Sequence, residues 1–348
     1  MRLWCVGARL SSFGTHQSLY QNRRETLLLC GRPMPGGHGV AEPIRHSLEP
    51  VAHTEDFLQR AARAVSVAAR ILGIPASRTG SPPELVRMGE RAVYRLCDGG
   101  VIARVERSAD RREEADREVR AARWLAEQSL PVTRPLNGKQ PVLAEGLLVT
   151  LWEGVQGEWT VPRELARLLR TLHHLTPPPS LGLPDLDPFH RVAERIDTAP
   201  GLDTAQRDLL RTHQQDLAAR WPTVTPALGT HVIHGDANIG NVLATPQGVV
   251  LFDLDGICWG PPEWDLVLTA LYRDLDWHTD TEYADFCDVY GFDVTSWDGY
   301  PLYKQVRELR MITWLAQKGG ESPEIDAEIA RRIADLAEPR RQRTWNPY

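Results

Sequence analysis

Lysine is scarce in this chain of 348 residues, although its lysines and arginines together number 40. The only lysines are Lys139, Lys304 and Lys318, and all the other basic residues are arginines. A site that depends on a lysine therefore has few candidates. Arginine, whose guanidinium is always charged and can bind an anionic group through two hydrogen bonds, is available throughout the chain.

Cysteine and long apolar runs are also in short supply. The five cysteines are widely spaced, their number is odd and no C-x-x-C occurs, which argues against a disulfide framework and a structural zinc site. The apolar run Leu3–Val6 is too short for a signal peptide, and no segment approaches the roughly 20 apolar residues that span a bilayer. These absences predict a cytoplasmic protein with reduced thiols.

Charge of either sign is not in large excess. The net charge is −6, charged residues make up 25% and hydrophobic residues 42% of the chain. There is thus no electrostatic reason to expect a nucleic-acid or membrane partner, and the chain can bury a sizeable core. These features leave the oligomeric state open.

Composition and periodicity divide the chain into three regions. Residues 1–50 are rich in Gly, Pro, Ser, Arg and His without a sustained period, which predicts a poorly ordered N-terminal extension. A start codon assigned too early would give the same appearance. Residues 51–152 and 153–348 have periodic apolar patterns and predict a first lobe and a larger second lobe.

The two lobes differ in their predicted elements. The first lobe is expected to be a small sheet with one long helix, and the second to be mostly helical. The elements expected in the first lobe are a helix capped by Thr54, strands over 92–96 and 101–105, a helix over 109–127 and a strand over 146–152. The helices expected in the second are 163–175, 203–221 with Asp203 as its N-cap, 263–275, 280–290, 302–317 and 323–336.

The region from 232 to 265 carries the clearest chemistry. A short apolar strand leads into His234-Gly235-Asp236-Ala237-Asn238-Ile239-Gly240-Asn241, and a hairpin then ends at Asp253. Asn241 and Asp253 are equidistant from Gln247 at its tip, so symmetric pairing would place them opposite each other, where two oxygen ligands can share Mg²⁺. With Asp236 as a base for an attacking hydroxyl, these are the parts that phosphoryl transfer needs.

The pattern His-Gly-Asp-x-x-x-x-Asn with a following Asp resembles the catalytic loop of the aminoglycoside phosphotransferase family, relatives of the protein kinases. The segment Gly260–Leu266 is similar to the structural segment that follows in that family. The resemblance implies an α+β, two-lobed protein-kinase-like fold with a small sheet-rich first lobe. It implies ATP or GTP and Mg²⁺ as cofactors, Asp236 as the catalytic residue and Asn241 and Asp253 as metal ligands. Singly, each of these three residues has a bland alternative as a turn or cap residue.

The resemblance also assigns residues of the first lobe to nucleotide binding. Arg104 stands where the family has a strand lysine for the phosphates, and Glu118 matches its helix partner. Leu151 and Trp152 resemble the hinge that binds adenine through its backbone, and residues 89–92 resemble a thin loop over the phosphates. The alternative is that Arg104 is a surface residue and that Glu118 pairs with another arginine.

The segment from Asp253 to Asp298 is strongly acidic. It contains twelve Asp and Glu residues, four interleaved tryptophans and one basic residue, Arg273. Carboxylates interleaved with aromatic rings suit a cationic small-molecule acceptor, such as an amino sugar or a choline-like alcohol. A solvated acidic surface is an equal alternative. Within it Asp255 is either a secondary metal or substrate contact or a loop cap, and the cap is favoured. Asp265 is expected to anchor the loop.

Two classes of function follow from these features. The first is an active kinase for a small-molecule hydroxyl. The second is a nucleotide-binding pseudokinase or regulatory module, which the arginine at 104 and the thin glycine loop keep open. A protein kinase is disfavoured, because only a short loop separates Asp253 from Asp265.

Overall fold

The computed structural model describes residues 49–74, 82–89, 91–338 and 342–348. All helices and strands below belong to one compact unit, Arg45–Asn346. The first helix, α2 (Glu49–Ile71), begins five residues before the predicted cap Thr54, so that prediction is wrong. Almost all of the extension predicted over 1–50 lies outside the described residues.

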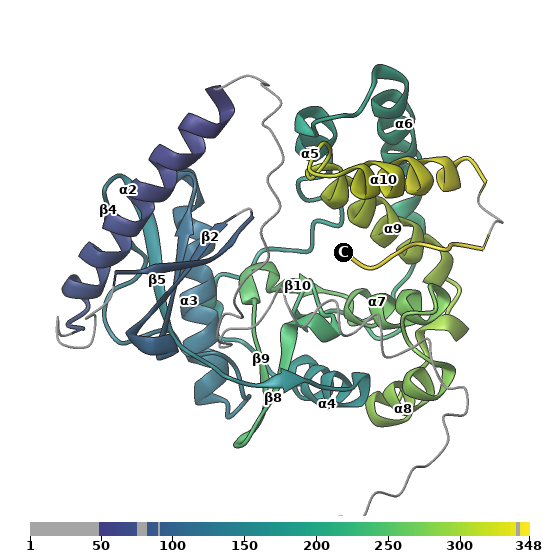
Figure 1. The fold of residues 1–348 in the computed structure, drawn as a ribbon. Coiled ribbons are helices and arrows are strands. Elements are labelled where there is room, and N and C mark those ends of the chain that lie inside the picture. The colour runs from purple at the N-terminus through teal and green to yellow at the C-terminus, as the bar shows by residue number, and fades with distance from the viewer. Residues whose placement is uncertain (1–48, 75–81, 90, 339–341) are drawn as a thin grey trace, which may run out of the picture. The chain divides into compact units, whose positions relative to one another are not determined.

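The first lobe is built on an antiparallel sheet of five strands in the order β1-β2-β3-β5-β4 (Figure 1). The strands are β1 (Glu84–Met88), β2 (Arg91–Leu96), β3 (Val101–Glu106), β4 (Val142–Ala144) and β5 (Leu147–Glu153). The predicted hairpin is confirmed, with pairs from Leu96–Val101 to Arg91–Glu106. The short strands β1 and β4 were not predicted.

Alternation along the strands divides the side chains of this sheet between two layers. Ala103 and Leu151 pack with the apolar face of α2. Their neighbours Ile102 and Trp152 point to the other face and join the core that contains helix α3 (Arg112–Glu127). Because successive strand residues point to opposite faces, one sheet can bury both helices.

The larger part of the chain is mainly helical, as predicted. Its helices are α4 (Pro162–His173), α5 (Val192–Thr198), α6 (Thr204–Arg220), α7 (Glu263–Asp274), α8 (Asp280–Tyr290), α9 (Tyr300–Ala316) and α10 (Pro323–Leu336). Apolar residues of all seven meet in one core, in which Trp264 is fully buried. Only the short helix α5 was not predicted. None of the described helices is long and apolar enough to cross a membrane.

Two small sheets hold the segment that was predicted to carry the chemistry. One pairs β7 (His231–Ile233) with β10 (Cys258–Gly260), and the other orders β6 (Glu158–Trp159), β8 (Val242–Thr245) and β9 (Gly248–Leu251). Together they fix both ends of the stretch from 233 to 258 on the helical core.

The register of the β8–β9 hairpin differs from the prediction by one residue. Thr245 pairs with Gly248 and Val242 with Leu251, so the loop contains two residues and is not centred on Gln247. Asn241 therefore lies beside Phe252, whose N–H donates to the Asn241 carbonyl at 3.0 Å. With two residues in the loop, the position opposite Asn241 is Phe252 and not Asp253. The prediction that Asn241 pairs directly opposite Asp253 is therefore wrong.

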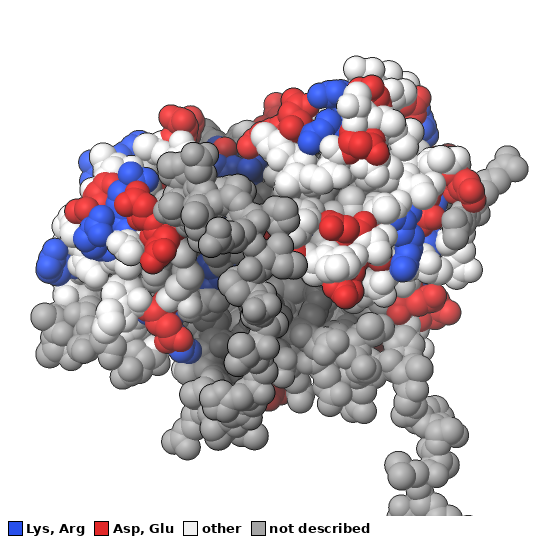
Figure 2. Space-filling view, turned by 45° about the horizontal axis from the view of Figure 1, so that its top comes forward, with Lys and Arg blue, Asp and Glu red and all other residues white. Residues whose placement is uncertain are grey.

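The surface drawn in Figure 2 carries both signs of charge. On this face the acidic and basic side chains of the described residues are interspersed over both parts of the chain. This face therefore offers mixed charge, in keeping with the modest net charge of −6.

The start of α6 gives a test of the local structure. Asp203 caps the helix by accepting from the Gln206 N–H at 2.8 Å, and the Gln206 side chain accepts from the Asp203 N–H at 3.0 Å. We expect Asp203→Ala to lower the free energy of unfolding by about 1 kcal/mol in urea titrations, because the first turn loses an acceptor. Asp216→Ala, which removes an exposed ion pair of the same helix, should change it by less than about 0.5 kcal/mol. Equal effects of the two variants would contradict the capping role.

Candidate active site

The loop from His234 to Asn241 is anchored by a buried carboxylate. Asp265, on the first turn of α7, is fully buried and accepts from the N–H groups of His234 at 2.7 Å and Gly235 at 2.9 Å. Nε2 of His173 lies 3.0 Å from the same carboxylate. Burial acts to raise the pKa of Asp265, but the hydrogen bonds and charges of His173 and His234 together outweigh burial and lower that pKa. The anchoring role expected for Asp265 is confirmed.

Gly235 is required by the shape of this loop. Its φ is +82°, and a Cβ there would lie 2.0 Å from the carbonyl oxygen of Gly256. Only glycine fits such a backbone at such a distance. The Gly235 carbonyl in turn accepts from the Trp264 indole at 2.8 Å, so both sides of the peptide are held.

Asp236 emerges from the anchored loop with its side chain 50% exposed. Its carbonyl accepts from the Asn241 amide nitrogen at 2.9 Å, so the structure brings these two predicted residues together. Nη1 of Arg307, a buried residue of α9, lies 3.5 Å from the Asp236 carboxylate. Arg307 also donates to the Trp264 carbonyl at 2.8 Å, and it lies over the Trp264 ring, with 3.8 Å from its Cζ to the ring centroid.

Arg307 had not been singled out from the sequence. Nothing in the local pattern of α9 separates it from the neighbouring arginines of that helix. Burial lowers its pKa to about 10, and the Asp236 charge acts in the opposite direction. The residue is thus a buried cation beside a half-exposed carboxylate.

Asp253 follows β9 in a left-handed backbone conformation, with φ +64° and ψ +59°. A non-glycine residue rarely adopts this conformation, and it turns the chain away from the strand direction. One carboxylate oxygen lies 3.4 Å from Nη1 of Arg104, and 42% of the side chain is exposed. Although burial acts to raise it, Arg104 and Arg91 hold the pKa of Asp253 below its ordinary value.

Arg104 and Glu118 are brought together as predicted. Nη1 of Arg104 donates to Oε1 of Glu118 across the space between β3 and α3. The Arg104 guanidinium also lies 5.1 Å from the centroid of the Trp152 ring. Its side chain is only 14% exposed, so the alternative of a surface strand residue is excluded.

Leu151 is placed differently from its prediction. Its N–H donates to the Gln140 side chain at 2.6 Å, and its carbonyl accepts from the Leu136 N–H at 2.8 Å and from Gln140 at 3.2 Å. Both main-chain groups are therefore paired within the first lobe. This argues against a role for Leu151 in hydrogen bonding to adenine.

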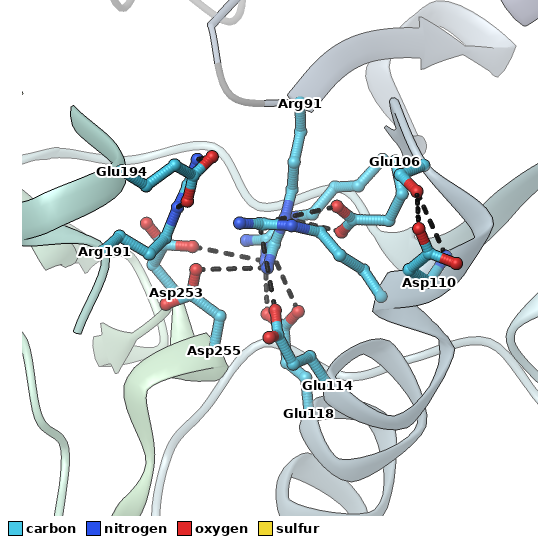
Figure 3. Close-up of polar contacts among 12 residues, drawn as sticks. Arg91, Glu106, Asp110, Glu114, Glu118, Arg191, Glu194, Asp253 and Asp255 are labelled. Atoms are coloured by element: carbon cyan, nitrogen blue, oxygen red, sulfur yellow. Dashed lines mark hydrogen bonds and ion pairs between the residues drawn. The ribbon is translucent and has the colours of Figure 1, made fainter. Parts of the chain in front are cut away.

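The sequence reading overlooked Arg91, although a signal for it was present. The register of the predicted hairpin pairs Arg91 with Glu106 across two strands. Their side chains form an ion pair at 2.6 Å, and Arg91 also contacts Glu118 and Asp255 (Figure 3). Residues 89–92 had been singled out only for a loop over the phosphates, and of these Glu90 lies outside the described residues.

The prediction that Asp255 caps a loop is wrong. Its carboxylate lies 3.1 Å from Nη2 of Arg91 and is 38% exposed. Burial and the neighbouring charge of Asp253 raise the pKa of Asp255, whereas Arg91 opposes that shift. Asp255 thus links the turn after β9 to the first strand pair of the sheet.

Metal ligation within the chain itself is sparse. Among the described residues, no three His, Cys, Asp or Glu side chains gather into a metal site. Mg²⁺ is commonly held in nucleotide sites by one or two protein oxygens with phosphates and waters. An Asn–Asp pair such as Asn241 and Asp253 is compatible with that mode.

The fold and the anchored Gly-Asp loop define a class of protein, the phosphotransferases with a protein-kinase-like fold. The sequence model described as "Phosphotransferase enzyme family" matches residues 84–309, more than half of the chain. The chain belongs to this family, whose members transfer phosphoryl groups to hydroxyl groups. A comparison with curated proteins found no match.

Solved structures with the same fold are distant in sequence. An amicoumacin kinase, hAmiN, in complex with AMP-PNP, Ca²⁺ and Ami is 13% identical, with a TM-score of 0.64 over 84% of this chain and 98% of that one. A microcompartment-associated aminopropanol kinase is 19% identical, with a TM-score of 0.57 over 78% of this chain and 94% of that one. Aminoglycoside phosphotransferase APH(3'')-Id from Streptomyces rimosus is 22% identical, with a TM-score of 0.53 over 74% of this chain and 98% of that one. At these identities the likeness shows the fold alone.

The buried Asp265 predicts a specific dependence of stability on pH. Because its pKa is lower in the folded state, its contribution is present above the unfolded value of about 4 and is lost as pH falls through the folded value. We expect Asp265→Asn to cost about 3 kcal/mol in urea unfolding at pH 7 and less near pH 3, because the wild-type carboxyl is then losing its charge too. A difference that is constant with pH would contradict the role of the charge.

Proposed function

We propose that the chain transfers the γ-phosphoryl group of ATP or GTP to a hydroxyl of a small molecule, with Asp236 as the catalytic base. The observation that carries this proposal is the anchored loop. Asp265 binds the N–H groups just before Asp236, and Asn241 binds the carbonyl of Asp236 itself. The half-exposed carboxylate is therefore held on a rigid backbone, as proton transfer from a bound hydroxyl requires.

In this proposal Asp236 orients the acceptor hydroxyl and accepts its proton. Phosphoryl transfer depends mainly on positioning and on neutralising charge, so the fixed loop supports the role more than basicity does. The buried Arg307 at 3.5 Å keeps a positive charge beside the carboxylate.

Mg²⁺ would be held by Asn241 and Asp253. Asn241 uses its amide nitrogen on the Asp236 carbonyl, so its Oδ1 is the atom that it can offer to a metal. The Asp253 carboxylate is partly exposed, and its oxygens are hard ligands of the kind that Mg²⁺ prefers. When bound, the ion neutralises charge on the phosphate oxygens.

Arg104 would bind the phosphates of the nucleotide. Its guanidinium lies between Glu118, which orients it, and Asp253, which is the proposed metal ligand. Trp152 packs beside it and limits its movement. Arginine can take the place of a lysine here because its planar fork matches phosphate oxygens.

For the acceptor we propose an alcohol that also bears an amine. The support is the acidic segment, six of whose carboxylates are exposed: Asp276, Asp280, Asp285, Asp288, Asp293 and Asp298. Others serve the fold, since Glu263 and Asp265 are fully buried and Asp274 pairs with Arg273 and Lys304. The charge available for a cation is therefore smaller than the sequence suggested.

Replacing the proposed base gives the direct test of catalysis. Asp236→Asn keeps the size of the side chain but removes its ability to accept a proton, so kcat for Mg²⁺-dependent phosphoryl transfer should fall ~10²–10⁴-fold. Asp208→Asn, an exposed residue of α6, is the matched control and should retain wild-type turnover. Turnover that survives in Asp236→Asn would remove Asp236 from this role.

The same measurement separates the two classes of function. A pseudokinase or regulatory module would bind nucleotide in the wild type but show no transfer to any acceptor. The intact set of Asp236, Asn241 and Asp253 favours turnover.

The nature of the acceptor can be tested by a phosphate-transfer screen. It should include aminoglycosides, amino sugars, macrolides, choline and amino-alcohols, each paired with a neutral alcohol of similar size. We expect higher kcat/KM for the amine-bearing member of the productive pair, because the exposed carboxylates attract a cation. Equal or lower kcat/KM for the amine would contradict a cationic acceptor.

A further inference from the structure

Arg91, the first residue of β2, joins three elements that lie far apart in the sequence. Its Nε lies 2.6 Å from Glu106 at the end of β3, its Nη1 lies 3.1 Å from Glu118 on α3, and its Nη2 lies 3.1 Å from Asp255 after β9. Figure 3 shows these carboxylates converging on the guanidinium. The Arg91 side chain is only 10% exposed, so its pairs with Glu106 and Glu118 are largely shielded from water.

Arg91 shares Glu118 with Arg104, but the two arginines are not equivalent. Arg91 takes Oε2 of Glu118 and Arg104 takes Oε1. Only Arg104 also contacts the proposed metal ligand, with Asp253 Oδ1 at 3.4 Å. Arg91 instead contacts Asp255, two residues further along the turn.

This arrangement suggests different roles for the two arginines. Arg91 keeps its contacts with Glu118 and Asp255, whereas Arg104 can exchange its contact with Asp253 for another partner. If Asp253 held a metal and a nucleotide were bound, Arg104 would exchange its contact with Asp253 for phosphate oxygens. Glu118, whose side chain is 3% exposed, would then lose part of its compensation if Arg104 were its only partner. A buried carboxylate without a partner is strongly unfavourable, and Arg91 supplies the second partner.

The contact with Asp255 extends this effect to the turn that carries Asp253. The residues Leu254–Gly256 form one 3₁₀ turn directly after the left-handed Asp253. A backbone in that conformation persists only where its surroundings hold it. The Arg91–Asp255 pair is a contact that holds this turn against the sheet of the first lobe.

We propose that Arg91 is a positioning residue for the metal-bound nucleotide, an inference that rests on the function proposed above. It fixes Glu118 and, through Asp255, the turn of Asp253, so that Arg104 is free to exchange Asp253 for phosphate. Arg91 itself does not bind the nucleotide. It acts on the metal ligand through a neighbouring residue, as hydrogen-bonded partners of metal ligands do.

The test measures AMP-PNP binding to the full chain by calorimetry, with and without Mg²⁺, so that no turnover is needed. We expect Arg91→Lys and Asp255→Asn each to reduce the enhancement of affinity by Mg²⁺ about tenfold, since lysine cannot reproduce three directed contacts. Affinity without metal should stay within about twofold of wild type, and the double variant should lose no more than Arg91→Lys alone.

Arg95→Lys is the matched control. It lies on the same strand and pairs with the exposed Glu84 at 2.6 Å, so its metal-dependent affinity should stay within about twofold of wild type. Should thermal melts show that Arg91→Lys is unfolded, Asp255→Asn decides the matter by the same criteria, because its side chain is partly exposed.

Three results would overturn the proposal. They are an unchanged Mg²⁺ effect in Asp255→Asn, independent losses that add in the double variant, and an equal loss with and without metal, which would make Arg91 a direct phosphate ligand. A wild type that binds Mg²⁺ and AMP-PNP together but transfers no phosphoryl group would remove the proposed function and leave this inference standing. A wild type without metal-dependent binding would overturn both.

Discussion

The site depends on one buried carboxylate, that of Asp265. Main-chain N–H groups are costly to bury without an acceptor, and two of them precede Asp236 at a point where Gly235 has a left-handed backbone. Asp265 accepts from both, and Nε2 of His173 lies 3.0 Å from the same carboxylate. The arrangement converts a glycine turn, which would otherwise have many conformations, into a rigid support for the Asp236 side chain.

The second constraint is electrostatic and lies between the sheet and helix α3. Arg91 and Arg104 contact four carboxylates in this space, and those side chains are shielded to different degrees, from 3% exposed at Glu118 to 42% at Asp253. Buried carboxylates persist only with cations whose geometry satisfies them, and the guanidinium can contact several at once. A chain that is poor in lysine can thus build this centre with arginine, and one of its carboxylates, Asp253, then contacts Arg104.

Particular residues show where reasoning from the sequence succeeds. The Arg104–Glu118 pair was expected from the family resemblance, and Asp203 was expected as the cap of α6. The cap is a local pattern, in which sequence spacing alone brings the groups together. Other predictions were wrong because a small change in loop geometry altered the pairing. With a two-residue loop in the β8–β9 hairpin, Asn241 lies beside Phe252 and not opposite Asp253.

The sequence by itself determined the element types, the two-part architecture and the residues with which phosphoryl-transfer chemistry can be built. Hydrophobic period, turn residues and the Gly-Asp-x-x-x-x-Asn spacing are all short-range properties. The tertiary structure alone decided that Asp255 pairs with Arg91, 164 residues away, and that the main chain of Leu151 is occupied by Gln140 and Leu136. Such contacts arise because packing brings distant charges and polar groups into a shielded space where each must find a partner, and no local pattern encodes which partner that is.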